Sequence, residues 1–186
     1  MTNRQFSESL PNGTRLLGGK YVIEKMLELD MLGFSYLAQI YDVSQNNIGN
    51  NQRGPVMIKE FFLRDIQTRL KAPLVDSTRD LEQVDFYTEQ FRKQIRKLRC
   101  LKHPYWLRIT DFFEENGTLY YVSDYVQAET IREYSAHHDQ LTEQQVLSIF
   151  CDIASVLYEM FRLNLLHTDI SPDNILFAKD GHAYVK

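Results

Sequence analysis

Short apolar stretches that carry β-branched and aromatic side chains recur among the polar residues of the first 126 positions. Stretches of this kind, bounded by turn residues, are typical of strands. They predict five strands, at residues 21–27, 34–40, 56–62, 106–113 and 119–126. The turn Glu115-Asn116-Gly117 joins the last two, and Asn-Gly between apolar runs is a strong hairpin signal.

Helical spacing of apolar residues interrupts and then follows the strands. Phe91, Ile95, Leu98 and Leu101 predict an amphipathic helix over residues 86–101. Thr142 with Gln145 forms a capping-box pattern that opens a second, longer helix. One apolar face is expected on that helix, formed by Val146, Ile149, Phe150, Ile153, Ala154, Leu157 and Phe161. A short hairpin, with strands at 175–177 and 183–185, is predicted to follow it.

Composition narrows the class of protein. The chain has 186 residues, a formal net charge of −4 and 44% hydrophobic residues, as in an ordinary soluble globular protein. Mild acidity gives no reason to expect nucleic-acid binding, and no apolar run is long enough to span a membrane. Without an apolar signal core at residues 1–11, and with Cys100 and Cys151 expected to be buried free thiols, a cytoplasmic location is predicted.

A local excess of positive charge stands out on the first predicted helix and just after it. A solvated helix face is favoured over a partner-binding patch for this cluster. Its members are Arg92, Lys93, Arg96, Lys97, Arg99 and Lys102.

Two motifs carry recognisable chemistry. Lys59 follows apolar residues on the third predicted strand, which by itself is a weak signal. The segment His167-Thr168-Asp169-Ile170-Ser171-Pro172-Asp173-Asn174 is far more specific. An Asp and an Asn five residues apart on one loop can accept a proton from an attacking hydroxyl and coordinate magnesium. The order strand lysine, helix, hairpin, long helix and H-x-D-x-x-x-x-N follows the signature set of protein kinases.

From about Leu10 onward the chain resembles bacterial members of the eukaryotic-type Ser/Thr protein kinases. The resemblance rests on the segments 19–25, 58–62, 103–104, 114–118 and 167–176. It implies an α+β, bilobal protein-kinase-like fold with a complete five-stranded N-lobe, one helix of the αC type and the first part of the helical C-lobe. The implied divisions are an N-terminal extension at 1–17, the N-lobe at 18–126, and the hinge with a partial C-lobe at 127–186.

The resemblance also implies a site for ATP and magnesium. Lys59 aligns with the phosphate-binding lysine, Asp169 with the catalytic base and Asn174 with the metal ligand. Ser123 falls at the gatekeeper position. The remaining positions implied to contact the nucleotide are Gly33, Met57, Leu176 and the hinge residues Asp124, Tyr125 and Val126.

The glycine-rich loop of the family departs from its pattern here. Of the loop's three glycines only Gly33 remains, and Glu28 and Asp30 replace the first two. A carboxylate about 4 Å from a phosphate would cost on the order of 4 kcal/mol at an effective dielectric near 20. Two outcomes stay open: the carboxylates face the site and weaken ATP binding, or they turn outward.

Other departures fall on both sides of the expected site. Met57 and Ser35 stand where the family places small apolar residues, and Met57 can fill part of the adenine space. Gln94 stands where a helix glutamate would pair with Lys59, and Thr168 replaces an arginine. The sequence given ends before the Asp-Phe-Gly motif, whose Asp holds magnesium in the family.

Three functions follow from these features. The favoured hypothesis is a kinase-fold module, inactive or strongly impaired in phosphoryl transfer, that acts by binding, with ATP and magnesium bound weakly or not at all. The alternative is an ATP- and magnesium-dependent Ser/Thr protein kinase recorded as a fragment. A small-molecule phosphotransferase is a minor alternative. A protein substrate or partner is expected, and either a partner or further C-lobe is expected to cover the apolar face of residues 142–164.

Overall fold

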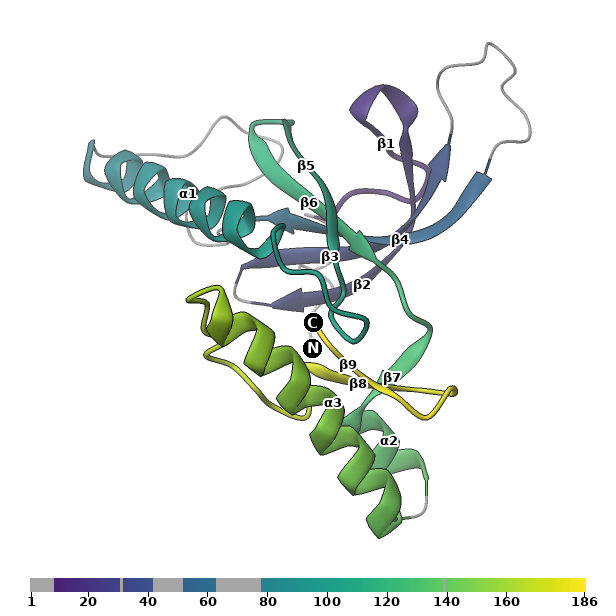
Figure 1. Cartoon of the computed structure of the whole chain (residues 1–186). Coiled ribbons are helices and arrows are strands. Elements are labelled where there is room, and N and C mark those ends of the chain that lie inside the picture. The colour runs from purple at the N-terminus through teal and green to yellow at the C-terminus, as the bar shows by residue number, and fades with distance from the viewer. Residues whose placement is uncertain (1–8, 31, 42–51, 63–77, 139) are drawn as a thin grey trace. The chain divides into compact units, whose positions relative to one another are not determined.

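The computed structural model describes residues 9–30, 32–41, 52–62, 78–138 and 140–186 (Figure 1). The chain forms two compact units. Unit 1 comprises Met1–Ile95 and Ile109–Tyr125, and unit 2 comprises Arg96–Arg108 and Val126–Lys186.

Unit 1 is built on a six-stranded antiparallel sheet of order β1-β2-β3-β4-β6-β5. Its strands are β1 (Arg15–Leu16), β2 (Tyr21–Asp30), β3 (Gly33–Tyr41), β4 (Gln52–Phe61), β5 (Ile109–Glu115) and β6 (Thr118–Asp124). All five predicted strands are present, and the Asn116-Gly117 hairpin between β5 and β6 is confirmed. The sequence did not predict β1, whose two residues are too few to show a period. A short 3₁₀ turn, η1 (Leu17–Gly19), separates β1 from β2.

The hydrophobic core of unit 1 lies on one face of this sheet. In neighbouring strands Tyr36 pairs with Ile58, and Ile58 pairs with Val122, so their side chains share a face. All three are fully buried in that core, together with Leu10 and Leu16 near the N-terminus. Because side chains alternate along a strand, the residues between them project from the opposite face.

Helix α1 (Thr78–Leu98) contributes buried apolar residues to unit 1. Phe91 and Ile95 are buried, and the ring of Phe91 stacks on that of Phe61 at 4.5 Å between centroids. The helix begins eight residues before the predicted start at residue 86, because the apolar spacing that predicts it covers only its C-terminal part.

Unit 2 combines two helices with a three-stranded antiparallel sheet of order β7-β8-β9. The elements are β7 (Ala128–Thr130), α2 (Ile131–His137), α3 (Glu143–Arg162), β8 (Ile175–Ala178) and β9 (Ala183–Val185). The predicted capping box at Thr142 and Gln145 is confirmed, as is the hairpin of β8 and β9. Neither β7 nor α2 was predicted. No helix within the described residues is long and apolar enough to cross a membrane.

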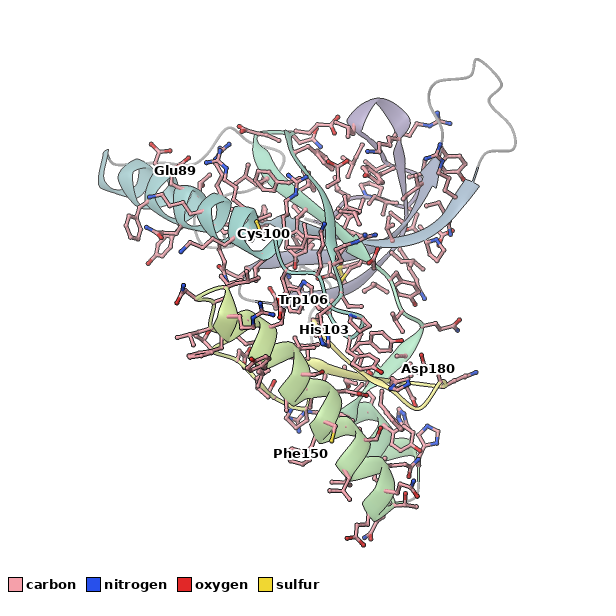
Figure 2. All side chains as sticks on the ribbon, in the orientation of Figure 1. Glu89, Cys100, His103, Trp106, Phe150 and Asp180 are labelled. Carbon is pink, nitrogen blue, oxygen red and sulfur yellow. The ribbon has the colours of Figure 1, made fainter. Side chains whose placement is uncertain are left out.

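The predicted apolar face of α3 is only partly buried in unit 2. The buried residues of the helix are Ile149, Asp152, Val156 and Met160. Phe150 and Phe161, which belong to the predicted face, are 66% and 71% exposed, and Figure 2 shows Phe150 projecting from the helix. Apolar residues occupy two sides of α3, and only one side packs in the core of unit 2.

A buried carboxylate explains why the packed side of α3 could not be read from hydrophobicity. Asp152 Oδ2 accepts a hydrogen bond from the Ala183 amide at 2.9 Å and lies 3.2 Å from His182 Nδ1. These contacts satisfy the carboxylate against the β8–β9 hairpin, so a charged residue lies on the buried side of the helix, which the apolar pattern did not indicate.

Both cysteines differ from expectation. Cys100 and Cys151 are free thiols, as predicted, but both are exposed rather than buried. Each follows an apolar pattern along the chain, yet its own position faces away from the buried side of its segment.

Candidate functional site

The face of the unit 1 sheet opposite the core carries four of the predicted site residues. Lys59 pairs with Ser35 on one side and Tyr121 on the other. Met57 pairs with Ser123 two residues along the same strands. The pairing register therefore places Met57, Lys59 and Ser123 on one face, and Gly33 lies at the start of β3 beside them.

The ammonium group of Lys59 is buried and held by groups of unit 1. The side chain is only 4% exposed, and Nζ lies 2.6 Å from Oδ2 of Asp30. Nζ also donates to the carbonyl of Gly33 at 3.1 Å and to Oγ of Ser35 at 3.3 Å. The residue expected to bind phosphate is therefore engaged in an intrachain ion pair.

The carboxylate of Asp30, which replaces a glycine of the family's loop, faces the predicted site. It does not turn outward: one oxygen contacts Lys59, and Oδ1 accepts hydrogen bonds from the amides of Leu32 at 2.8 Å and Gly33 at 3.2 Å. Glu28 is exposed. Met31, in the same loop, lies outside the described residues.

Gly33 is required by strand packing. Its φ is +134°, and a Cβ at this position would lie 2.1 Å from the Glu60 carbonyl oxygen and 2.6 Å from the Phe62 amide nitrogen. No side chain fits at such distances without a backbone shift. The last glycine of the loop is thus explained by the approach of β3 to β4, independently of any phosphate.

Met57 and Ser123 lie next to each other beyond Lys59. Met57 is partly exposed and pairs with the partly exposed Leu37 of β3. Ser123 is 1% exposed, and its buried Oγ has no hydrogen-bond partner among the described groups. Such an orphaned polar atom is uncommon in a folded protein and points to an additional partner.

The predicted hinge residues lie at the division of the chain. Asp124 ends β6, where it pairs with Val56. Tyr125 is the last residue of unit 1, and Val126 is the first residue of the second part of unit 2.

Helix α1 was expected to provide Gln94 in place of an acidic partner for Lys59. Gln94 is exposed, whereas its neighbours Phe91 and Ile95 are buried. Glu89 contacts Arg92 Nε at 3.0 Å. The carboxylate found at Lys59 instead comes from Asp30, a partner that sequence reasoning did not identify.

Tyr121 lies beside Lys59 on the neighbouring strand, and its phenol is affected by burial and by nearby carboxylates. Desolvation of the phenol, together with the nearby carboxylates of Asp30 and Glu28, raises the pKa of Tyr121 well above its usual value. Both acidic side chains therefore contribute to the electrostatic potential where Lys59 emerges from the sheet.

The catalytic-loop motif lies in unit 2, and its two key residues contact each other. The amide nitrogen of Asn174 donates to the Asp169 carboxylate at 2.6 Å and to the Asp169 carbonyl at 3.0 Å. Asp169 is exposed. Both contacts use the amide nitrogen and leave the amide oxygen, the atom that magnesium would need, outside the interaction.

Strand β8 begins directly after Asn174 and anchors the loop. Leu176 lies on this strand, paired with Thr130 of β7 and Tyr184 of β9, and is partly exposed. The backbone amide of Lys186 donates to the Asn174 carbonyl at 3.1 Å, which ties β9 to the end of the loop.

The start of the loop is also fixed within unit 2. His167 Nε2 donates to the Lys186 carbonyl at 3.0 Å, and the imidazole packs edge-on against Trp106. Next to it, Thr168 has a φ of +61°. A β-branched residue rarely adopts this left-handed conformation, so the backbone between His167 and Asp169 is strained.

An ion pair that sequence reasoning missed connects the loop to α2. Arg132 Nε lies 2.5 Å from Asp173 Oδ1, and Nη2 lies 2.8 Å from Oδ2. This two-point hydrogen bond holds the pKa of Asp173 below its usual value near 3.8. No sequence signal could have revealed the pair, because α2 itself was not predicted.

The predicted site residues of the two units differ in their surroundings. In unit 2, Asp169 is an exposed carboxylate and its contact with Asn174 does not use the amide oxygen, so both groups suit an oxygen-liganded cation. In unit 1, Lys59, the residue expected to bind phosphate, is ion-paired with Asp30. Within the described residues, no group of three or more His, Cys, Asp or Glu side chains could hold a metal ion by itself.

Comparisons of the sequence and the fold with known proteins identify the family of this chain. Residues 65–186, about two thirds of the chain, match the protein kinase domain family. The chain is 28% identical over 138 residues to the serine/threonine-protein kinase PrkC of Bacillus subtilis, and 32% identical over 124 residues to the serine/threonine-protein kinase Nek1 of Mus musculus. These matches cover 74% and 60% of this chain but only 21% and 10% of the relatives.

Solved structures show the same fold across nearly the whole chain. The apo form of PpkA-294 matches with a TM-score of 0.80 and 23% identity, over 96% of this chain and 60% of that one. A double mutant of the Mycobacterium tuberculosis PknI kinase domain matches with a TM-score of 0.67 and 20% identity, over 95% of this chain and 62% of that one. The expected α+β protein-kinase fold is confirmed, and the chain belongs to the protein kinase domain family.

Proposed function

We propose that this chain is a kinase-fold binding module that is inactive, or strongly impaired, in phosphoryl transfer as it stands. One observation carries the proposal. The ammonium of Lys59, aligned with the phosphate-binding lysine of the family, is 4% exposed and ion-paired with Asp30 of the adjoining loop at 2.6 Å.

Phosphoryl transfer is especially sensitive to such a change. Protein kinases use ATP and magnesium, and their catalysis depends on positioning and on positive charge around the transferred group. A lysine neutralised by its own chain contributes little of that charge. We therefore expect ATP and magnesium to bind weakly or not at all, even though Asp169 and Asn174 are present.

A Ser/Thr protein kinase remains the second candidate. It is favoured by the contact between Asp169 and Asn174, which holds a catalytic base and a metal ligand together on one loop. The curated relatives are Ser/Thr protein kinases, and this chain spans about a fifth or less of the length of the first two. In this reading a longer protein would phosphorylate a protein substrate.

The exposed side of α3 is the surface that we propose for a partner. It carries the large apolar side chains of Leu147, Phe150, Tyr158 and Phe161, which are between 58% and 71% exposed. A contiguous apolar stripe of this kind is typical of a protein interface. Either a protein partner or the remaining helical lobe of a kinase domain would fit it.

Transfer of radiolabelled phosphate from Mg-ATP to a generic protein substrate, and to the chain itself, tests the proposal. The wild-type chain should incorporate no more label than Asp169→Asn, which removes the base and keeps the shape of the loop. Incorporation that is lost in both Lys59→Met and Asp169→Asn would instead establish the kinase reading.

A further inference from the structure

Lys59 has no hydrogen-bond donor left for a phosphate. An ammonium carries three N–H donors. Among the described groups, three acceptors lie around it: Asp30 Oδ2 at 2.6 Å, the Gly33 carbonyl at 3.1 Å and Ser35 Oγ at 3.3 Å. A phosphate oxygen could reach this ammonium only by displacing one of them.

Asp30 also occupies the backbone donors of its loop. Its Oδ1 accepts from the Leu32 amide at 2.8 Å and the Gly33 amide at 3.2 Å. One carboxylate thus receives an ammonium and two successive backbone N–H groups. This donor set, a lysine and the amides of a tight turn, is the one that binds phosphate anions in proteins. The carboxylate of Asp30 therefore occupies the position that a phosphate group would need.

The charge balance of the face changes accordingly. Lys59 contributes one positive charge, and the carboxylate of Asp30 offsets it. A ligand with several phosphate groups therefore gains no net attraction from this pair, whereas an uncharged ligand needs none.

Features suited to an uncharged ring lie two residues further along the same strands. Leu37 and Met57 are partly exposed apolar neighbours on β3 and β4. Opposite Met57, the buried Oγ of Ser123 has no partner among the described groups. An apolar surface with one unsatisfied polar atom suits a planar heteroaromatic ligand.

We propose that this face of unit 1 binds an uncharged heteroaromatic ligand, such as a nucleoside, in preference to a nucleoside triphosphate, because Asp30 fills the anion site. The inference rests on the proposed function, since it names the ligand class of the same binding module. Asp30 acts as the residue that determines selectivity.

Isothermal titration calorimetry of the chain with adenosine and with Mg-ATP tests the selectivity. Wild type should bind adenosine at least as tightly as Mg-ATP. Asp30→Asn, which keeps the size of the side chain and removes its charge, should raise the affinity for Mg-ATP by about tenfold or more and change adenosine affinity by less than about threefold.

Glu24→Gln is the matched control. Glu24 is an exposed carboxylate on the same strand that contacts Gln39 rather than Lys59. The substitution changes the net charge by the same amount, so it should leave both affinities unchanged. Equal gains in Mg-ATP affinity for the two variants would show a general charge effect and overturn the role of Asp30.

Ser123→Ala tests the polar contact independently of Asp30. Because Oγ has no partner among the described groups, its removal should not lower the melting temperature, yet it should weaken adenosine binding by roughly three- to tenfold. Unchanged adenosine binding would overturn the assigned contact.

Two further results would overturn the inference as a whole: tighter binding of Mg-ATP than of adenosine to wild type, or no adenosine binding to a folded chain. Neither would contradict impaired catalysis, which fails only if phosphate is transferred. Transfer by wild type with the expected selectivity would contradict the proposed function alone.

Discussion

Lys59 in unit 1 and the Asp169–Asn174 pair in unit 2 are both recognisable parts of the kinase signature, but their surroundings differ. Lys59 is buried, and groups of its own chain meet all of its donors. Asp169 is exposed, and its contact with Asn174 leaves the amide oxygen outside the interaction. The difference teaches that a lysine of the family signature can keep its place on the strand and still be ion-paired by a neighbouring residue of its own chain.

The match to the protein kinase domain family also differs between the segment that carries Lys59 and the segment that carries Asp169 and Asn174. It begins at residue 65, after the segment that carries Asp30, Gly33 and Lys59, and it includes the whole of the loop from His167 to Asn174. The solved structures nevertheless match 95% or more of the chain. Unit 1 therefore keeps the fold while its site-bearing sequence departs from the family pattern.

The largest expected change in stability comes from adding a side chain at Gly33, where β3 approaches the backbone of β4. Gly33→Ala should lower the free energy of unfolding by roughly 3–5 kcal/mol, since the added Cβ collides with the β4 backbone and the positive φ is strained as well. Urea denaturation monitored by circular dichroism measures the change.

Gly117→Ala separates the two causes. Gly117 has a φ of +72°, but a Cβ added there would meet no atom within 4 Å, so only the backbone strain applies, about 1–2 kcal/mol. Equal losses for the two variants would show that the approach of β3 to β4 tolerates a methyl group, and that Gly33 is not explained by packing.

A smaller effect of opposite sign is expected in the unit 2 loop. Thr168→Asn should raise the free energy of unfolding by about 1 kcal/mol, because asparagine tolerates the left-handed conformation better than a β-branched residue. Thr168→Val keeps the branch and should bring no gain. A comparable gain in the valine variant would mean that the hydroxyl, rather than the backbone, destabilises the loop.

The smallest effect concerns the exposed Arg132–Asp173 pair. The pKa of Asp173 is lower in the folded chain than its usual value near 3.8, so its contribution to stability is complete above that pH and is lost as the pH falls through the folded pKa. Asp173→Asn should therefore lower the melting temperature slightly at pH 7, and the difference should vanish in strong acid.

Arg132→Gln should reproduce that pH dependence, because either variant removes the same pair. A melting-temperature difference that stays constant from pH 7 into strong acid would show that Asp173 acts through packing or the backbone, not through its charge.

Much of this site was predictable because its signals are local. The Asn116-Gly117 hairpin, the Thr142 capping box and the placement of Lys59 on a strand depend on residues within a few positions of one another. Asp169 and Asn174 are five residues apart and make their contact within a single loop. Short-range preferences of the chain are sufficient to produce such features.

Ion-pair partners within the chain, and the buried side of α3, could not be predicted from local sequence. Asp30 lies 29 residues from Lys59, and Arg132 lies 41 residues from Asp173. On α3, the apolar pattern could not decide between Phe150, which is exposed, and Asp152, which is buried. In each case several candidate positions were compatible with the local sequence.

The amino-acid sequence by itself determined the order of strands and helices, the family signature and the residues that could do chemistry. Only the tertiary structure decided that Asp30 neutralises Lys59, that Gly33 serves strand packing and that α3 buries a carboxylate beside the β8–β9 hairpin. The physical reason is that periodicity and capping act over a few residues. Burial and ion pairing depend instead on which distant backbone segments approach closely enough to exclude water.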